Sequence, residues 1–401
     1  MDMKKYLAGM FLLFGALSVF AAKAPEFSTK VILTKAVNID DQFLHILPGR
    51  PPVFPQVSKV VCGEKFFMEI VFFNAAQKNG SALLKGKITI CAPGGKKEVI
   101  TLKEQSLKIK GDPQGVFLFP QNLSVMFDPG DPLGVHSFEV ELTDRHSGKR
   151  ARSSAKLEYV KSVAPATDDN EAFKKIGNYY KAPSPENIIP AFRAYLKKIP
   201  AQKAKEKKNF NPLPQLALFY FCLKENPQYV DAFAEEIGKL TDRREKMMGW
   251  LILNFLSPEA AQKVPAADKK SIAGGFAANP FEIKKVSAPW HLDICWAEFF
   301  VRGTREPLLK IVDALAFFKG SISIPEFKKI AKPTQEEKRK LFNGLIAMAA
   351  QWSINSLAKQ HVLIRYYVEA ALQRGEIKDP VCAAVAAKAV GMNVRLAPAK
   401  K

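Results

Sequence analysis

Few of the residues that usually build metal and thiol sites occur in this chain, since its 401 residues include five cysteines, five histidines and four tryptophans. The motifs G-x-S-x-G, H-E-x-x-H, G-x-x-x-x-G-K-[ST], G-x-G-x-x-G and C-x-x-C are absent as well. Each of these motifs sets reactive groups at a spacing that a particular chemistry needs. By motif, the sequence therefore predicts no catalytic, metal or cofactor site, and we expect no cofactor.

Long hydrophobic runs are also scarce. After the N-terminus the longest apolar stretch is residues 216–223, which is far shorter than the roughly 20 residues that cross a bilayer. At the N-terminus, Lys4 and Lys5 precede the apolar residues 6–20, and small side chains stand at Val19 and Ala21. This layout is typical of a secretory signal peptide, which we expect to span residues 1–21 and to be cleaved after Ala21.

A secretory signal peptide would place the mature protein outside the cytoplasm. The first cysteine is Cys62, far from the cleavage point, so we do not expect a lipoprotein. We expect a soluble mature protein, periplasmic or secreted, with no transmembrane segment after signal cleavage.

Acidic residues are in the minority: 60 Lys and Arg stand against 39 Asp and Glu, a formal net charge of +21. A basic exported protein suits an anionic envelope polymer, and an unknown protein is the other expected kind of partner. We do not expect nucleic acid as a partner, because no aromatic residues for base stacking interleave with the densest basic run. That run contains Lys197, Lys198, Lys203, Lys205, Lys207 and Lys208.

The cysteine count is odd, so at least one thiol is unpaired within the chain. Cys62 and Cys91 fall in the same β-rich half, and they are the candidates for a disulfide between neighbouring strands. Cys222, Cys295 and Cys382 lie in apolar helical contexts, where we expect buried free thiols.

Residues 25–162 read as an antiparallel, immunoglobulin-like β-sandwich, because short runs rich in Val, Ile and Phe alternate with turn residues. Residues 136–142 (HSFEVEL) show the two-residue period of a half-buried strand. Just before them, residues 131–136 (DPLGVH) resemble the D-x-x-G-x-Y corner of immunoglobulin-like domains. His136 stands in the place of the corner tyrosine, which leaves the corner bond open, although an imidazole nitrogen could replace the hydroxyl. We expect a structural role for His136.

The hydrophobic period changes after the β half. We expect a linker at residues 163–170, an all-α domain at residues 171–395 and a basic tail at residues 396–401. One amphipathic helix is marked by four apolar residues at steps of four, three and four, preceded by a capping box of Thr334 and Glu337. The four residues are Leu341, Leu345, Met348 and Trp352.

The best remaining place for chemistry is residues 289–298 (PWHLDICWAE). On a helix that starts at Pro289, His291 and Cys295 are four residues apart and share a face. They could form half of a zinc site or a Cys–His pair for thiol chemistry, with His361 or His45 as further partners. The alternative is an aromatic-rich core helix in which Asp293 is bonded near the N-terminus and Trp296 is a packing residue.

Several segments of the helical half match those of one protein group. They are residues 178–186 (NYYKAPSPE), 189–192 (IPAF), 226–227 (NP), 292–300 (LDICWAEFF) and 303–305 (GTR). With these segments the chain resembles a group of exported bacterial proteins that carry an α-helical domain and have no established function. The resemblance implies export and a helical domain, here preceded by the β domain. It makes Asp293 and Trp296 worth mutating, without giving either a role.

Three classes of function stay open. The leading expectation is a non-enzymatic exported protein that binds or scaffolds at the bacterial envelope. The alternatives are an envelope-directed hydrolase and a helper in assembly or secretion. A cleft that gathers His291, Asp293 and another titratable group would favour an enzyme, whereas a broad exposed apolar face would favour partner binding.

Overall fold

The computed structural model describes residues 26–47, 50, 52–109, 115–121, 123–206 and 211–392. The structure is mixed α+β, with 48% of residues helical and 20% in strands. It divides into two compact units: the first ends at Ser162 but omits Ala36–Leu47, and the second combines Ala36–Leu47 with the chain from Val163 onward. The predicted signal peptide (1–21) and basic tail (396–401) lie outside the described residues.

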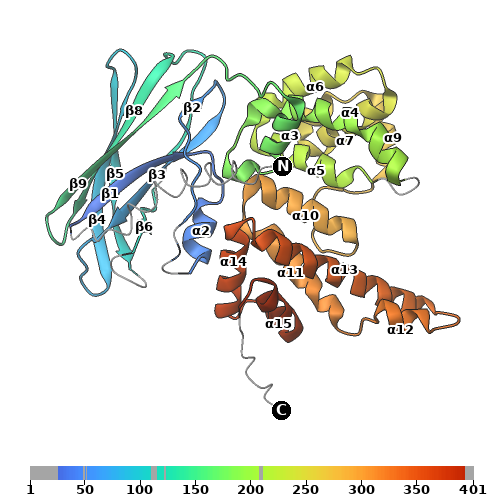
Figure 1. Cartoon of the computed structure of the whole chain (residues 1–401). Coiled ribbons are helices and arrows are strands. Elements are labelled where there is room, and N and C mark those ends of the chain that lie inside the picture. Colours follow the sequence, from blue (N-terminus) through green and yellow to red (C-terminus); the bar gives the residue numbers. More distant parts are fainter. Residues whose placement is uncertain are drawn as a thin grey trace, which may run out of the picture. The chain divides into compact units, whose positions relative to one another are not determined.

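The first unit, whose strands run from blue (β1) to green (β9) in Figure 1, is built from strands in two sheets. One sheet has the order β1-β3-β6, with β7 also paired to β3, and the other has the order β2-β9-β8-β4-β5. Pairing is antiparallel except between β2 and β9. The strands are β1 (Ser28–Thr34), β2 (Lys59–Val60), β3 (Lys65–Phe73), β4 (Ser81–Cys91), β5 (Lys97–Lys108), β6 (Phe117–Leu118), β7 (Leu123–Met126), β8 (Gly134–Asp144) and β9 (Arg150–Tyr159).

Side chains from both sheets form one hydrophobic core. Phe66 of β3 meets Phe138 of β8 edge to face, with ring centroids 5.7 Å apart, and both are fully buried. Along β8, Phe138 and Val140 are buried while Glu139 between them is exposed. The two-residue alternation predicted for residues 136–142 is confirmed, because successive side chains of a strand point to opposite faces.

His136 forms a local hydrogen bond at the start of β8. Its Nε2 lies 2.9 Å from the carbonyl oxygen of Pro132, and since a carbonyl only accepts, Nε2 carries the donated proton. The side chain is buried, and its ring lies 4.5 Å from that of Phe127. The hydrogen bond and the burial fit the structural role predicted for His136.

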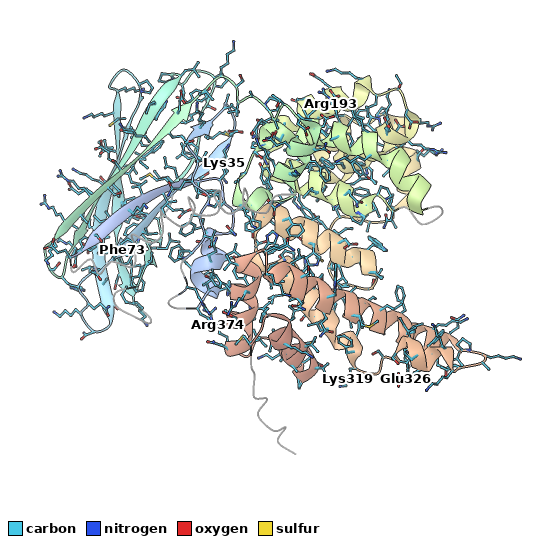
Figure 2. The ribbon with its side chains drawn as sticks, viewed as in Figure 1. Lys35, Phe73, Arg193, Lys319, Glu326 and Arg374 are labelled. Atoms are coloured by element: carbon cyan, nitrogen blue, oxygen red, sulfur yellow. The ribbon has the colours of Figure 1, made fainter. Side chains whose placement is uncertain are left out.

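A buried ion pair supports the first unit near β2. Lys35 Nζ lies 2.7 Å from Glu64 Oε2, and the same oxygen accepts the N–H of Val61 at 3.0 Å. Figure 2 labels Lys35 among the drawn side chains. Because Glu64 is 2% exposed, it needs these two donors to offset the loss of hydration.

The predicted disulfide between Cys62 and Cys91 is not formed, and all five cysteines are free thiols. Cys62 follows β2, which pairs with β9, whereas Cys91 ends β4 and pairs with Ser137 of β8. The sheet order β2-β9-β8-β4 puts three strand spacings between them, about 14 Å. A disulfide needs Cα atoms within about 7 Å, so sheet order forbids the bridge.

The second unit is helical from Val163 onward, and none of its described helices is long and apolar enough to cross a membrane. Short 3₁₀ turns η2 (Tyr179–Lys181), η3 (Pro185–Asn187), η4 (Pro227–Tyr229) and η5 (Ala314–Phe318) connect several of these helices. The helices are α3 (Asp169–Ile176), α4 (Ile188–Glu206), α5 (Leu213–Glu225), α6 (Val230–Lys239), α7 (Arg243–Leu256), α8 (Pro258–Gln262), α9 (Ala266–Gly275), α10 (Pro289–Arg302), α11 (Arg305–Asp313), α12 (Ile324–Lys328), α13 (Gln335–Ala358), α14 (Val362–Gln373) and α15 (Pro380–Ala389).

Capping residues begin several of these helices. Asp168 accepts hydrogen bonds from the N–H groups of Asn170 and Glu171, so α3 starts inside the predicted linker. The predicted capping box of α13 is confirmed: Glu337 N–H donates to Thr334 Oγ1 at 3.2 Å, and Thr334 N–H donates to Glu337 Oε2 at 2.7 Å.

One segment departs from the predicted division of the chain. The sequence predicts a continuous β domain over residues 25–162, whereas Ala36–Leu47, with α2 (Ile39–His45), belongs to the helical unit. Asn38 of this segment is buried and bonds to a residue 265 positions later in the chain. No local sequence pattern predicts this hydrogen bond of Asn38, because the bond depends on where the later helices place their backbone.

Candidate functional site

The predicted residues of α10 occupy separate surroundings. His291 lies in the first turn, where its Nδ1 accepts the N–H of Ser287 at 3.1 Å and its ring stands edge-on to Trp290 at 4.1 Å. Partial burial lowers the pKa of His291, so its neutral form is favoured. Its role in the structure is to close the turn that leads into α10.

Cys295 and Trp296 are core residues, whereas Asp293 is exposed. Burial raises the pKa of the Cys295 thiol to about 12, so the thiolate that nucleophilic or metal chemistry needs is disfavoured at neutral pH. The indole of Trp296 stacks on Phe300 with ring centroids 5.9 Å apart. The packing reading of this helix, in which Trp296 is a core residue, agrees with these contacts.

The two other histidines named for a metal site have their own partners. His361 Nδ1 lies 2.8 Å from the hydroxyl of Tyr180, and burial lowers the pKa of this imidazole to about 4. His45 lies on α2, where its Nδ1 is 3.3 Å from Nη1 of Arg305. Within the described part of the chain, no three or more His, Cys, Asp or Glu side chains gather as a metal site would need.

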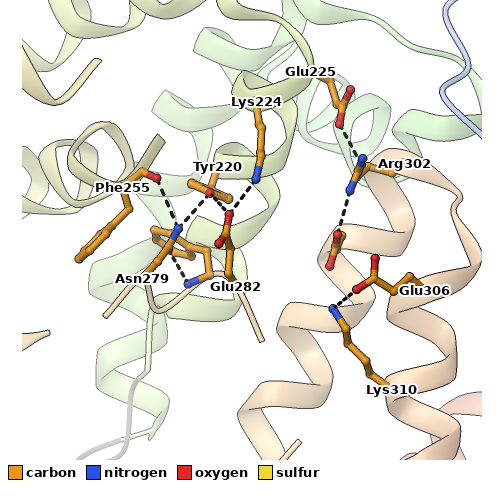
Figure 3. A network of polar contacts seen from close by, with 11 residues as sticks. Tyr220, Lys224, Glu225, Phe255, Asn279, Glu282, Arg302, Glu306 and Lys310 are labelled. Atoms are coloured by element: carbon orange, nitrogen blue, oxygen red, sulfur yellow. Dashed lines mark hydrogen bonds and ion pairs between the residues drawn. The ribbon is translucent and has the colours of Figure 1, made fainter. Parts of the chain in front are cut away.

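A network of polar side chains that the sequence did not single out joins α5 to the segment before α10 (Figure 3). Tyr220 donates to Glu282 Oε1 at 3.0 Å, and Lys224 Nζ lies 2.8 Å from the same oxygen. Asn279 Nδ2 donates to the hydroxyl of Tyr220 at 3.0 Å. The hydrogen bond from Lys224 is the largest cause of a lowered pKa at Glu282, so this carboxylate stays ionised near neutral pH.

Arg302, at the end of α10, forms a separate pair of contacts nearby (Figure 3). Its guanidinium lies 2.9 Å from Glu225 of α5 and 3.1 Å from Glu298 one turn earlier on its own helix. Burial raises the pKa of Glu298, and Arg302 and Lys310 oppose that rise. Both carboxylates engage the same cation, and the pair with Glu225 holds α5 and α10 together.

The residues that hold α2 form the second polar cluster, here called the α2 docking site. Asn38 Nδ2 donates to the carbonyl of Gly303 at 2.9 Å, and the N–H of Arg305 donates to Asp41 Oδ2 at 2.9 Å. Arg374, labelled in Figure 2, donates to the carbonyl of Leu44 at 2.6 Å. The Arg305 guanidinium also pairs with Glu376.

Gly303 is the centre of the α2 docking site. It ends α10 with φ of +61°, and a Cβ there would lie 2.5 Å from Asn38 Nδ2 and 2.8 Å from Tyr180 Cδ2. Residues 178–186 and 303–305, which are far apart in the sequence, therefore meet at this point through Tyr180 and Gly303.

A third feature is an apolar helix face that the described residues leave uncovered. We call it the α13 stripe, and it consists of Leu341, Leu345, Met348 and Trp352. Trp352 is 73% exposed and Met348 42%, while the two leucines are half-buried. The buried face of α13 is a different set of residues, Gly344, Ile346, Ala347, Ala350 and Ile354.

An amphipathic helix normally packs its single apolar stripe on the core. The pattern correctly predicts the helix, but the stripe lies on the side away from the core. The signal that shows this is the second apolar set on the opposite face of the same helix. A helix that is apolar on two faces over the same turns has one face left for another surface.

Comparison with known proteins identifies a structural neighbour for part of the chain. No protein-family model matches the chain, and no curated protein matches it. Among solved structures, a family 123 glycoside hydrolase from Clostridium perfringens, studied for glycolipid glycan hydrolysis, aligns with 42% of this chain and 34% of its own. The identity is 10% and the TM-score 0.22, which support no statement about the fold or function of this protein.

Proposed function

We propose that this protein is an exported, non-enzymatic binding or scaffolding protein of the bacterial envelope, and that it contacts its partner through the α13 stripe. The observation that carries the proposal is the 73% exposure of Trp352 beside exposed Met348. Large exposed apolar side chains grouped on one face mark interaction surfaces, and tryptophan is among the residues that contribute most at them. Phe342, 42% exposed, lies next to the same stripe.

Export rests on the N-terminal sequence. Lys4 and Lys5, the apolar residues 6–20 and Ala21 fit a cleaved signal peptide, and the resemblance to exported bacterial proteins agrees with it. The proposed location is the periplasm or the outside of the cell.

The β unit is, in this proposal, an immunoglobulin-like sandwich that precedes the helical domain. Its support is the core shared by two antiparallel sheets and the bond of His136 to Pro132, which replaces the corner tyrosine. Loops cluster at the two ends of such a sandwich, where they can form a binding surface, which suits a scaffolding role.

Retention on the native envelope tests the proposed function. The purified mature chain is mixed with washed envelope fragments of the organism that makes it, and the bound fraction is compared with that of a Met348→Ser/Trp352→Ser double variant. We expect the double variant to bind about tenfold less or weaker still, because it loses two apolar contacts. The matched control is Val99→Ser/Val135→Ser, which removes two exposed apolar side chains from the β unit. Equal retention of all three proteins would refute the role of the stripe.

A further inference from the structure

We propose that the α13 stripe binds an anionic lipid surface, with α13 lying along the membrane interface. This inference rests on the proposed function and names its partner class. From Leu341 to Trp352 the stripe is about 16 Å long at 1.5 Å per residue. A helix with Trp, Phe and Leu on one side and lysines around them lies in the headgroup region without crossing the bilayer.

Lysines extend the stripe at both of its ends. Lys338 lies three residues before Leu341, and Lys359 lies seven residues after Trp352, so both fall on the same side of α13 by helical spacing. Both are exposed, and Lys359 keeps a helical backbone at the C-cap. A lysine beside an apolar stripe buries its methylenes and leaves its ammonium at the headgroups.

Positive charge also dominates the chain leading into α13. Residues 324–340 hold six basic and three acidic side chains. The acidic ones have local partners: Glu326 and Glu337 close capping boxes, and Glu336 pairs with Lys340 at 3.0 Å. In Figure 2, the labels Lys319 and Glu326 mark the part of the unit around α12, where Ile324 adds a further side chain that is 42% exposed.

A second copy of the chain fits this face poorly. Antiparallel pairing of two α13 stripes would bring Lys338 of one copy toward Lys359 of the other, and parallel pairing would bring each lysine beside its own equivalent. Both arrangements place like charges at the ends of the apolar contact, where they are destabilising. The charges therefore favour an anionic partner.

The type and spread of the cations favour lipid headgroups over an acidic protein. Five of the six basic residues at 324–340 are lysines, which act as flexible point charges, whereas bidentate recognition of carboxylates favours arginine. They are spread over α12, the chain after it and the start of α13, including Lys328, Lys332 and Lys338. A distributed set of point charges suits a surface that is uniformly anionic.

Vesicle binding tests the inference. The mature chain is sedimented with vesicles of equal parts phosphatidylglycerol and phosphatidylcholine, and with phosphatidylcholine alone, while tryptophan emission is recorded. We expect sedimentation and a blue shift only with the anionic vesicles. The Met348→Ser/Trp352→Ser variant should bind about tenfold less, the Lys338→Gln/Lys359→Gln variant about fivefold less per lysine, and the Val99→Ser/Val135→Ser control like the wild type.

The outcomes separate this inference from the proposed function. If neither vesicle binds while envelope retention still depends on Met348 and Trp352, the lipid partner is refuted and the binding function stands on another partner. If anionic vesicles bind the stripe variant as well as the wild type, general basic charge explains binding and the inference fails. A dimer in the absence of lipid that the same double variant abolishes would refute it in favour of a second copy. Unchanged thermal unfolding of the variants shows that they remain folded.

Discussion

Gly303→Ala is expected to destabilise the helical unit by more than the usual cost of a left-handed alanine. Gly303 has φ of +61°, a conformation that costs alanine about 1 kcal/mol. The new Cβ would also lie 2.5 Å from Asn38 Nδ2 and 2.9 Å from Tyr180 Cγ, and both side chains are buried. Overpacking of this kind costs about 1–3 kcal/mol, which gives a total of about 2–4 kcal/mol.

Gly320→Ala is the matched control. Gly320 has φ of +74°, and nothing lies within 4 Å of where its Cβ would stand, so this substitution should cost only about 1 kcal/mol. The difference between the two variants isolates the contact with Asn38 and Tyr180. Because both glycines belong to the helical unit, the same unfolding transition reports on both.

Tryptophan fluorescence during urea unfolding measures the difference. All four tryptophans, at 250, 290, 296 and 352, lie in the helical unit, so the signal follows that unit alone. We also expect faster amide hydrogen exchange in residues 36–47 of Gly303→Ala, because Asn38 loses its place against the Gly303 carbonyl. Equal unfolding free energies for the two variants would show that the packing around Gly303 does not hold α2.

Three further predictions concern single side chains. Burial lowers the pKa of His361 to about 4, so between pH 6.5 and 4 the imidazole is protonated in the unfolded chain and neutral in the folded one. His361 therefore contributes about 3 kcal/mol to the free energy of unfolding above pH 6.5, and we expect this contribution to be lost as the pH falls toward 4. As the pH is lowered, the urea midpoint of His361→Gln should fall less steeply than that of the wild type. Parallel curves of midpoint against pH for the two proteins would contradict this. Exposed Cys62 should react first with a thiol reagent, and buried Cys222 only on unfolding. The mass of the intact protein should not change on reduction. A reducible Cys62–Cys91 bridge would refute the sheet order. His136→Ala should speed hydrogen exchange in β8 and cost about 1–2 kcal/mol, while His136→Tyr should restore protection; equal exchange in the two variants would contradict a role for the bond to Pro132.

Local patterns correctly predict local structure in this protein. The alternation in β8 and the capping box of Thr334 and Glu337 depend on residues within one strand or one turn, and the structure shows both. The imidazole bond of His136 is also local, since its acceptor Pro132 lies four residues earlier. For such features the sequence spacing already fixes which groups meet.

Predictions that needed a partner far along the chain were less successful. His291 and Cys295 share a helical face, as their spacing indicates. However, Cys295 is a buried core thiol, and the Nδ1 of His291 already accepts a hydrogen bond from the N–H of Ser287. The prediction of a Cys62–Cys91 disulfide was wrong because two strands, β9 and β8, lie between β2 and β4 in the sheet. Spacing along the chain carries no information on sheet order or on depth in a core.

By itself the sequence determined the basic charge, the change from a β to a helical period near residue 163 and the apolar stripe of α13. The tertiary structure decided that Ala36–Leu47 joins the helical unit and that Trp352 faces outward. A repeat of 3.6 residues in the sequence predicts which side chains share a face of a helix. Whether that face is exposed depends on which of the two apolar faces the other helices cover. On α13 they cover the face with Gly344, Ala347 and Ala350, whose small side chains allow close approach, and they leave Met348 and Trp352 exposed.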